Sequence, residues 1–244
     1  MMATPLDPIR HRQTLVGAFP DYAHARQQQH AILGFGEIAL AAADYPLALM
    51  KHADTGRVNI VALYGLSTSS KLYIAGARWH ATYSPQNSLR YPFFSNDAGT
   101  LGLAIDERSE LIGVSDGHRV FDDAGIPTQY TRQIANTLRE LRRDFEAMQE
   151  LVSALTRLHL VKPMSVVLHT GDGSESRLEG LYSVSDQALS ALADADVVKL
   201  HRKGYLQAVS VVMASLVQIN RLQQLHNAQS GPQIRDVELL LRER

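Results

Sequence analysis

Residues 130–158, YTRQIANTLRELRRDFEAMQELVSALTRL, carry the clearest periodic pattern in the chain. Apolar side chains recur at alternating steps of four and three positions, and arginine and acidic side chains fill the other faces. The apolar set is Ile134, Leu138, Leu141, Phe145, Met148, Val152 and Leu155. This spacing predicts one long amphipathic helix that ends near Lys162-Pro163. A heptad repeat is also typical of a coiled coil, but its short length and the flanking strand patterns favour a helix that lies across a sheet.

Short strand patterns occupy the residues that precede this helix. Apolar runs of a few residues alternate with turn-forming sequences such as Ala53-Asp54-Thr55-Gly56 and Asn96-Asp97-Ala98-Gly99. Residues 47–126 are therefore expected to form an antiparallel meander. Farther upstream, residues 32–43 favour a helix that Tyr45-Pro46 ends, because a residue before proline is disfavoured in the α region.

The residues after the long helix predict a hairpin and then more helices. Residues 164–169 and 177–184 flank Gly171-Asp172-Gly173-Ser174, a turn-forming sequence. Helical patterns follow at residues 186–193 and 196–227. This order of elements predicts an α+β fold with a largely antiparallel sheet, from which the long helix and the C-terminal helices are segregated.

Three segments are expected along the chain. Residues 1–30 are polar and weakly periodic, which indicates a partly ordered N-terminal arm. Residues 31–228 are expected to form a single α+β domain, and a chain of 244 residues is long enough for a full hydrophobic core. Residues 229–244 contain Gly231-Pro232 and a charged end, which indicate a C-terminal tail or a short docking helix.

The composition excludes several classes of protein. The chain has no cysteine, so a disulfide scaffold, a cysteine-ligated metal and a cysteine nucleophile are excluded. A net charge of −1 provides no field that attracts nucleic acid, which is therefore not an expected partner. The N-terminus lacks the pattern of a secretory signal, and the most apolar window, residues 32–50, contains Glu37, Asp44 and Pro46. We therefore expect a cytoplasmic protein without a membrane span.

Common catalytic and cofactor motifs are incomplete in this sequence. Gly113-Val114-Ser115-Asp116-Gly117 matches the nucleophile elbow, but no helix pattern follows the serine, so a glycine-rich turn is favoured. Gly34-Phe35-Gly36 lacks the third glycine and the acidic residue of a dinucleotide site. The ten histidines are scattered without the local spacing of metal ligands. No cofactor and no metal site is expected.

Residues 78–94, RWHATYSPQNSLRYPFF, stand out chemically, and we call them the aromatic–arginine segment. They contain the only tryptophan of the chain. Rigid aromatic rings beside guanidinium groups are typical of surfaces that bind carboxylates, sugars or peptide edges. The expected binding residues are Arg78, Trp79, Tyr83, Arg90 and Tyr91. A corner of the hydrophobic core is the alternative interpretation, and it is favoured for Trp79 and Phe93.

Several short sequences follow one another in a fixed order. They are Glu37 with Asp44-Tyr45-Pro46, Lys71-Leu72-Tyr73-Ile74, Trp79 with Tyr83-Ser84-Pro85, Arg90-Tyr91-Pro92-Phe93, Val120-Phe121-Asp122 and Gly204-Tyr205-Leu206. This ordered set resembles the SapC family of bacterial proteins over about residues 32–227. Two positions depart from the family pattern. Ser67-Thr68-Ser69-Ser70 stands where relatives tend to carry a glycine-rich, acidic segment. Leu89 stands where relatives tend to carry the first of two arginines.

The resemblance implies a role beside bacterial surface or uptake systems. The family takes its name from surface-layer protein loci of Gram-negative bacteria, and its members tend to lie near genes for flavin-dependent tryptophan halogenases and TonB-dependent receptors. Gene neighbourhood does not establish chemistry. We therefore expect an accessory or binding protein of a surface-export, uptake or peptide- or metabolite-modification system. Its partner would be a peptide, a small ligand or another protein of the same system.

Two other hypotheses stay open at this point. An enzyme acting on a peptide or small metabolite would need a histidine and a carboxylate to converge, and the candidates are His80, Glu37 and Asp106. A structural homodimer would form through the apolar face at residues 134–155. The lack of a complete catalytic constellation favours binding over catalysis.

Overall fold

The computed structural model describes residues 3–17, 22–52, 55–66, 72–75, 78–229 and 232–242, without the side chains of Ala23, Ile74, Ala75 and Arg78. The chain divides into two compact units, each built from two separate stretches of sequence. Unit 1 comprises Met1–Ala25 and Gln86–Asp144, and unit 2 comprises Arg26–Pro85 and Phe145–Arg244. One boundary between the units falls inside the long helix α4, Gln129–Arg157.

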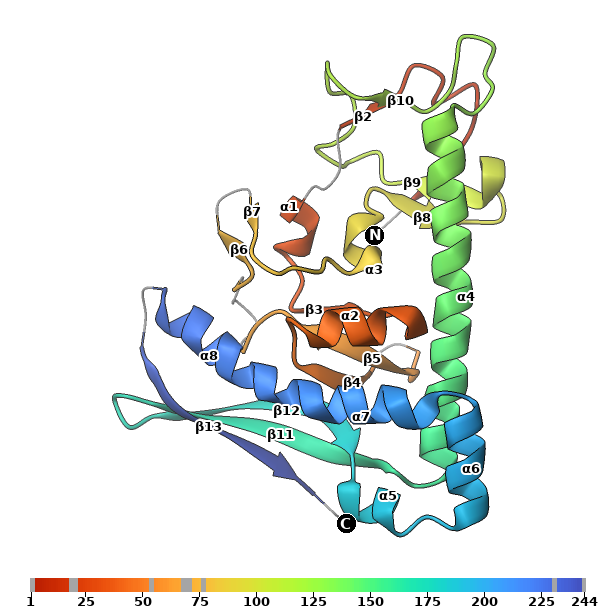
Figure 1. Ribbon diagram of the computed structural model, residues 1–244. Coiled ribbons are helices and arrows are strands. Elements are labelled where there is room, and N and C mark those ends of the chain that lie inside the picture. The colour runs from red at the N-terminus through yellow and green to blue at the C-terminus, as the bar shows by residue number, and fades with distance from the viewer. Residues whose placement is uncertain are drawn as a thin grey trace. The chain divides into compact units, whose positions relative to one another are not determined.

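Unit 2 is organised around a six-stranded antiparallel sheet (Figure 1). Its strand order is β13-β11-β12-β4-β5-β3, so the C-terminal strand lies at one edge and an N-terminal strand at the other. The bounds are β3 His30–Ile32, β4 Leu47–Lys51, β5 Val58–Leu63, β11 Val161–Thr170, β12 Glu175–Val184 and β13 Ile234–Leu241. The hairpin of β11 and β12 confirms the prediction made from the glycine-rich turn between them.

Short helices complete unit 2. Helix α2 packs against α7, α7 packs against β4, and α8 packs against β13. The bounds are η1 Phe35–Glu37, α2 Ile38–Ala42, α5 Asp186–Ser190, α6 Asp194–Arg202, α7 Tyr205–Ser215, η3 Leu216–Gln218 and α8 Ile219–Asn227. A small two-stranded sheet, β6 Ile74–Ala75 and β7 Arg78–Trp79, precedes the rest of the aromatic–arginine segment.

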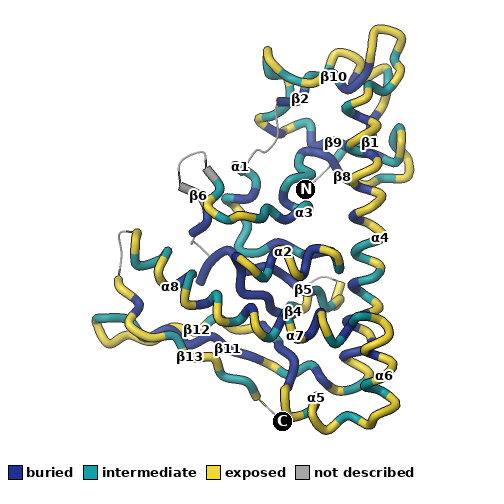
Figure 2. The backbone as a smooth tube through the Cα atoms, in the orientation of Figure 1, coloured by how far each residue is buried: buried dark blue, intermediate teal, exposed yellow. Residues whose placement is uncertain are grey.

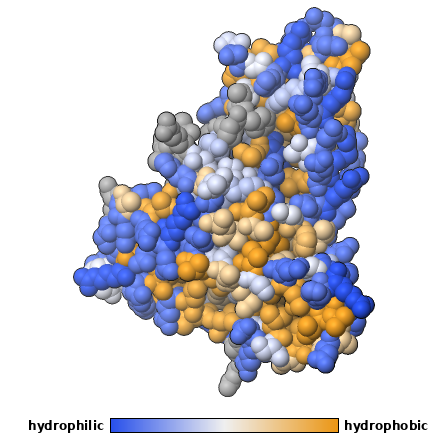
Figure 3. Space-filling model, viewed as in Figure 1, coloured by the Kyte–Doolittle hydropathy of each residue, from blue (hydrophilic) through white to orange (hydrophobic). Residues whose placement is uncertain are grey.

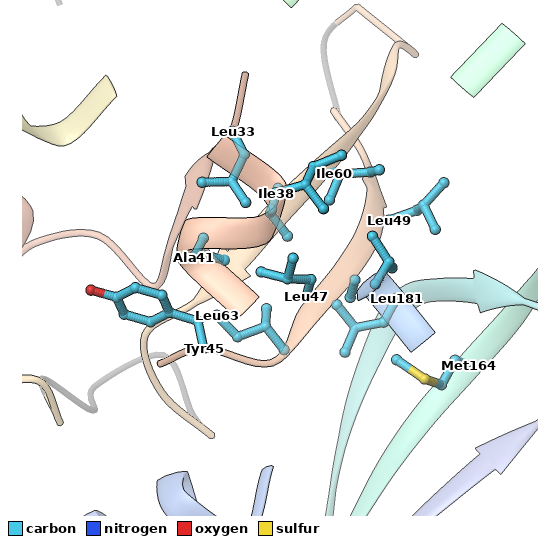
Figure 4. Packing of buried hydrophobic residues seen from close by; sticks show 14 of the residues in the cluster. Leu33, Ile38, Ala41, Tyr45, Leu47, Leu49, Ile60, Leu63, Met164 and Leu181 are labelled. Carbon is cyan, nitrogen blue, oxygen red and sulfur yellow. The ribbon is translucent and has the colours of Figure 1, made fainter. Parts of the chain in front are cut away.

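The core of unit 2 lies between this sheet and its helices. Ile38 and Ala41 of α2 lie beside Leu47 and Leu49 of β4, and all four are at most 2% exposed (Figure 4). Figure 2 shows a continuous buried stretch in β4 and in β5. Figure 3 shows hydrophobic side chains gathered around α7. Residues 164–168 of β11 are buried one after another, so this strand is covered on both faces.

Unit 1 contains two small antiparallel sheets and the first part of α4. Strands β1, β9 and β8 form a three-stranded sheet in that order, and β10 pairs with β2. The bounds are β1 Thr4–Pro5, β2 Leu15–Val16, α1 Tyr22–Ala25, α3 Gln86–Leu89, β8 Phe93–Ser95, η2 Thr100–Gly102, β9 Leu103–Ile105 and β10 His118–Arg119.

The structure confirms the α+β class, the antiparallel pairing and the long helix. Two elements differ from the sequence-based expectation. Residues 234–241 form strand β13 rather than a tail or a short docking helix, because their backbone pairs along almost the whole of β11. The expected meander of residues 47–126 is divided among several sheets, with β4 and β5 in the large sheet and β9 paired between β8 and the N-terminal β1.

Candidate functional site

The aromatic–arginine segment is divided between the two units. Residues 78–85 belong to unit 2 and residues 86–94 to unit 1. The side chain of Arg78 lies outside the described residues, so this candidate stays a prediction. The other candidates fall into an anchored group in unit 2 and an arginine-centred group in unit 1.

Aromatic rings anchor the first half of the segment to the core of unit 2. The ring of Trp79 meets that of Tyr64 edge-on at 5.1 Å, and Tyr45 packs 4.6 Å from Tyr73. The indole Nε1 of Trp79 donates to the Tyr45 hydroxyl at 2.7 Å. Burial raises the pKa of both Tyr45 and Tyr73, so both hydroxyls stay protonated and act as donors. Trp79 therefore belongs to the framework.

Two buried carboxylates hold Tyr83. Its hydroxyl donates to Glu37 Oε1 at 2.7 Å, and its backbone N–H donates to Asp44 Oδ2 at 2.9 Å. Glu37 Oε2 also accepts from the Gly34 N–H at 2.7 Å. Glu37 is 4% exposed and Asp44 2% exposed, so these charge-assisted bonds lie away from water, where they are strong. Glu37, a catalytic candidate in the sequence, is thus engaged in positioning the segment.

An arginine that the sequence did not single out completes this anchor. Arg221 of α8 donates from Nη1 to Asp44 Oδ1 at 2.7 Å and from Nη2 to the His80 carbonyl at 3.1 Å. Its guanidinium also lies 5.6 Å from the ring centre of Tyr73. Arg221 and Asp44 are 177 positions apart, and no local motif links them. Together with Glu37 and Tyr83 they form what we call the carboxylate clamp.

Arg90 has a different environment in unit 1. Its Nε donates to Asn87 Oδ1 at 2.8 Å, its Nη1 donates to the Phe93 carbonyl at 2.9 Å, and its guanidinium lies 4.5 Å above the Phe94 ring. All of these partners are neutral, and among the described residues no carboxylate forms an ion pair with Arg90. Burial lowers the pKa of Arg90 to about 10. A guanidinium removed from water without a counter-charge is costly to a fold.

Tyr91 follows Arg90 in the sequence, and the fold of unit 1 brings an imidazole ring and a carboxyl group to it. The rings of Tyr91 and His24 are stacked at 4.0 Å with an angle of 4° between them. The Tyr91 hydroxyl donates to Asp106 Oδ2 at 3.3 Å, and the Tyr91 ring meets Phe94 edge-on. Sequence reasoning missed His24, because it is one of many scattered histidines and only the fold brings it to Tyr91.

Each of the enzyme candidates has its described contacts within its own unit. Asp106 is 7% exposed, belongs to unit 1 and accepts from Tyr91 and from the backbone of Arg108, whereas Glu37 and His80 belong to unit 2. His80 is exposed and takes part through its carbonyl. Within the described parts of the chain, no group of three or more histidine or carboxylate side chains could hold a metal ion. No helix in those parts is long and apolar enough to cross a membrane.

Fold and site together define an α+β protein in which one half of an aromatic segment is clamped by carboxylates and the other half carries a desolvated arginine. The chain belongs to the SapC family, whose model matches residues 6–222. No curated protein and no solved structure matches the chain.

Proposed function

We propose that this protein is an accessory binding protein that recognises an anionic group, such as the carboxylate of a peptide or small metabolite, at Arg90. It would serve a bacterial surface-export, uptake or modification system in the cytoplasm. The observation that carries the proposal is the guanidinium of Arg90, which is desolvated and has only neutral partners among the described residues.

An arginine in this state is suited to a ligand that brings its own negative charge. Two of its N–H groups are used within the protein, by Asn87 and Phe93, and these bonds together with the Phe94 ring fix the plane of the guanidinium. The residue is half-buried, so it is not closed off from solvent. A planar, fixed guanidinium binds a carboxylate or phosphate through two parallel hydrogen bonds.

The neighbours of Arg90 favour a ligand with an apolar or aromatic portion. The Phe94 ring lies 4.5 Å from the guanidinium, and Tyr91, which meets Phe94 edge-on, is held by stacking on His24 and by its bond to Asp106. Rigid aromatic side chains of this kind contribute contact area at low entropic cost. A peptide C-terminus or an aromatic carboxylate combines both features.

Binding of short peptides with free or amidated C-termini tests the proposal. We expect the free-acid peptides to bind the wild type, and Arg90→Ala to weaken that binding about 10–100-fold, because a hydrogen bond to a charged group contributes about 1.5–3 kcal/mol. Arg90→Lys keeps the charge but loses the two-bond geometry and should recover only part of the affinity. Arg108→Ala, an exposed arginine of unit 1, is the matched control. Equal binding by Arg90→Ala and the wild type would contradict the proposal, as would equal binding of both peptide forms.

A further inference from the structure

Strand β13 is an edge of the large sheet, and among the described residues side chains cap only its first residue: Asn227 of α8 bonds to both the N–H and the C=O of Ile234. No hydrogen bond from another described residue covers the outer side of its second half. The strand is eight residues long, and its protective features, the charged Arg235 and Asp236 and a register irregularity opposite Ile234, lie toward its start, whereas residues 239–241 contain no charge and no proline. The opposite edge strand, β3, has only three residues. Leu239, Leu240 and Leu241 follow one another in β13, and Leu239 is 37% exposed. Such an edge requires a partner or a protective device.

The hydrogen-bonding groups of β13 fix which residues face the open edge. The Arg242 N–H donates to the Pro163 carbonyl of β11 at 2.9 Å. In an antiparallel ladder these bonds alternate, so Leu240 and Glu238 also point their backbone groups toward β11. The backbone N–H and C=O groups of Leu239 and Leu241 therefore point outward, away from the sheet.

The run Glu238-Leu239-Leu240-Leu241-Arg242 is self-complementary. If a second copy pairs antiparallel about a two-fold axis at Leu240, each Glu238 faces an Arg242 and each Leu239 faces a Leu241. The outward backbone groups of Leu239 and Leu241 then bond to each other, as the ladder requires. Opposite charges and apolar residues placed directly across two strands both stabilise a pair.

A pocket beside the same residues gives this edge an apolar side. It has a volume of about 230 Å³, and its lining includes Met164, Met213, Leu216, Leu239 and Leu241. Val217, next to this lining in the sequence, is 64% exposed. In the paired arrangement Leu239 and Leu241 of the second copy lie on the pocket side of the sheet, since directly paired residues share a face. They would cover the exposed Leu239 of the first copy.

We propose that β13 is a dimerisation edge at which two copies of this chain join their sheets through residues 238–242. The occupant is a second copy because the run supplies both halves of each charge pair. This surface is separate from Arg90 and does not depend on the binding function proposed above. It also differs from a coiled-coil dimer, since Leu138, Leu141, Met148, Val152 and Leu155 of the α4 apolar face are already buried by the chain itself.

Sedimentation velocity over a concentration series measures whether the wild type and charge-reversal variants of residues 238–242 form dimers. We expect the wild type to rise with concentration from 27.0 kDa toward twice that mass. Glu238→Arg and Arg242→Glu should each remain at the monomer mass over the same range, because each places like charges across the axis. The double variant Glu238→Arg/Arg242→Glu restores both pairs and should associate as the wild type does. An equimolar mixture of the two single variants should form heterodimers, because each chain then supplies the charge that the other lacks.

The controls separate this edge from other surfaces. Glu179→Arg reverses an exposed charge on β12 and should leave association unchanged, and circular dichroism checks that every variant is folded. A wild type that stays at 27.0 kDa at the highest concentration overturns the proposal. So does association that the single variants do not alter, which would locate the contact elsewhere. A loss that neither the double variant nor the mixture restores also overturns it, because the charges would then act on folding.

Discussion

Replacing Arg221 by alanine removes the cation that faces the Asp44 carboxylate in the carboxylate clamp. The side chain of Asp44 is 3% exposed and that of Arg221 is 34% exposed. Removing one partner of a buried ion pair costs roughly 3–5 kcal/mol, because the remaining charge is left without compensation. A third of Arg221 already contacts water, so solvent will relieve part of this cost. We expect the free energy of unfolding to fall by about 2–3 kcal/mol.

Urea unfolding followed by Trp79 fluorescence measures this loss. Trp79 is the only tryptophan and is bonded within the same cluster, so its emission reports on unit 2. Gln218→Ala is the matched control, since Gln218 donates to the Ala43 carbonyl from an exposed position at 3.0 Å, and its loss should cost about 1 kcal/mol or less. A double-mutant cycle with Asp44→Ala then isolates the coupling between the two charged groups.

Two results would show that the Arg221–Asp44 ion pair does not stabilise the carboxylate clamp. If Arg221→Ala and Gln218→Ala lower the stability equally, the ion pair contributes no more than an exposed hydrogen bond. If the cycle with Asp44→Ala gives no coupling energy, the two side chains act independently despite their 2.7 Å contact. In either case the anchoring of residues 80–83 would depend on the hydrogen bonds of Tyr83 to Glu37 and Asp44 and on aromatic packing, without a contribution from the ion pair.

Further predictions concern the other side of the clamp and the β11–β12 turn. Tyr83→Phe should lower the free energy of unfolding by about 1.5–3 kcal/mol, because it removes a hydrogen bond to the buried Glu37 carboxylate; an unchanged urea midpoint would contradict this. Hydrogen bonds from the Thr170 hydroxyl and from the Ser174 N–H and hydroxyl lower the pKa of Asp172 to about 2. Because the folded-state pKa lies below the ordinary 3.8, these bonds stabilise the turn above about pH 4 and are lost as the pH falls toward 2. An NMR titration should show a midpoint near 2 for Asp172, whereas a midpoint near 3.8 would show that the turn does not hold the carboxylate.

The sequence predicted best the elements whose cause is local. The four-three spacing of apolar residues defined α4 almost to its ends, since a helix buries one face at that period. The turn at Gly171-Asp172-Gly173-Ser174 likewise defined the hairpin of β11 and β12. Strand β13 was missed because three of its first five residues, Arg235, Asp236 and Glu238, are charged and resemble a charged tail. It is a strand because it pairs with β11, which lies some seventy residues earlier in the chain. A local sequence pattern does not predict this pairing.

The sequence predicted which segment forms the candidate site, but not the role of each residue in it. Residues 78–94 were selected for their aromatic and arginine content, and the expected core position of Phe93 is confirmed, since it is fully buried. Tyr83 was expected to bind a ligand, yet both its hydroxyl and its backbone are occupied by the carboxylate clamp. The partners responsible, Glu37 and Asp44, lie about forty positions before Tyr83 in the sequence, and Arg221, which pairs with Asp44, lies 177 positions after Asp44, so only the fold reveals these contacts.

Arg221 and Arg90 support different roles because their charges have different partners. Where Arg221 serves the fold, the chain places the buried carboxylate of Asp44 2.7 Å away, which is the usual way to compensate a desolvated cation. Arg90 is also partly withdrawn from water, but its partners among the described residues are an amide, a carbonyl and a phenyl ring. If Arg90 served the fold alone, a neighbouring carboxylate would stabilise it. If it binds an anionic ligand, a neighbouring carboxylate would compete with that ligand. The lack of a counter-charge for Arg90 among the described residues is therefore the feature that makes it, rather than Tyr83 or Trp79, the residue on which the binding proposal depends.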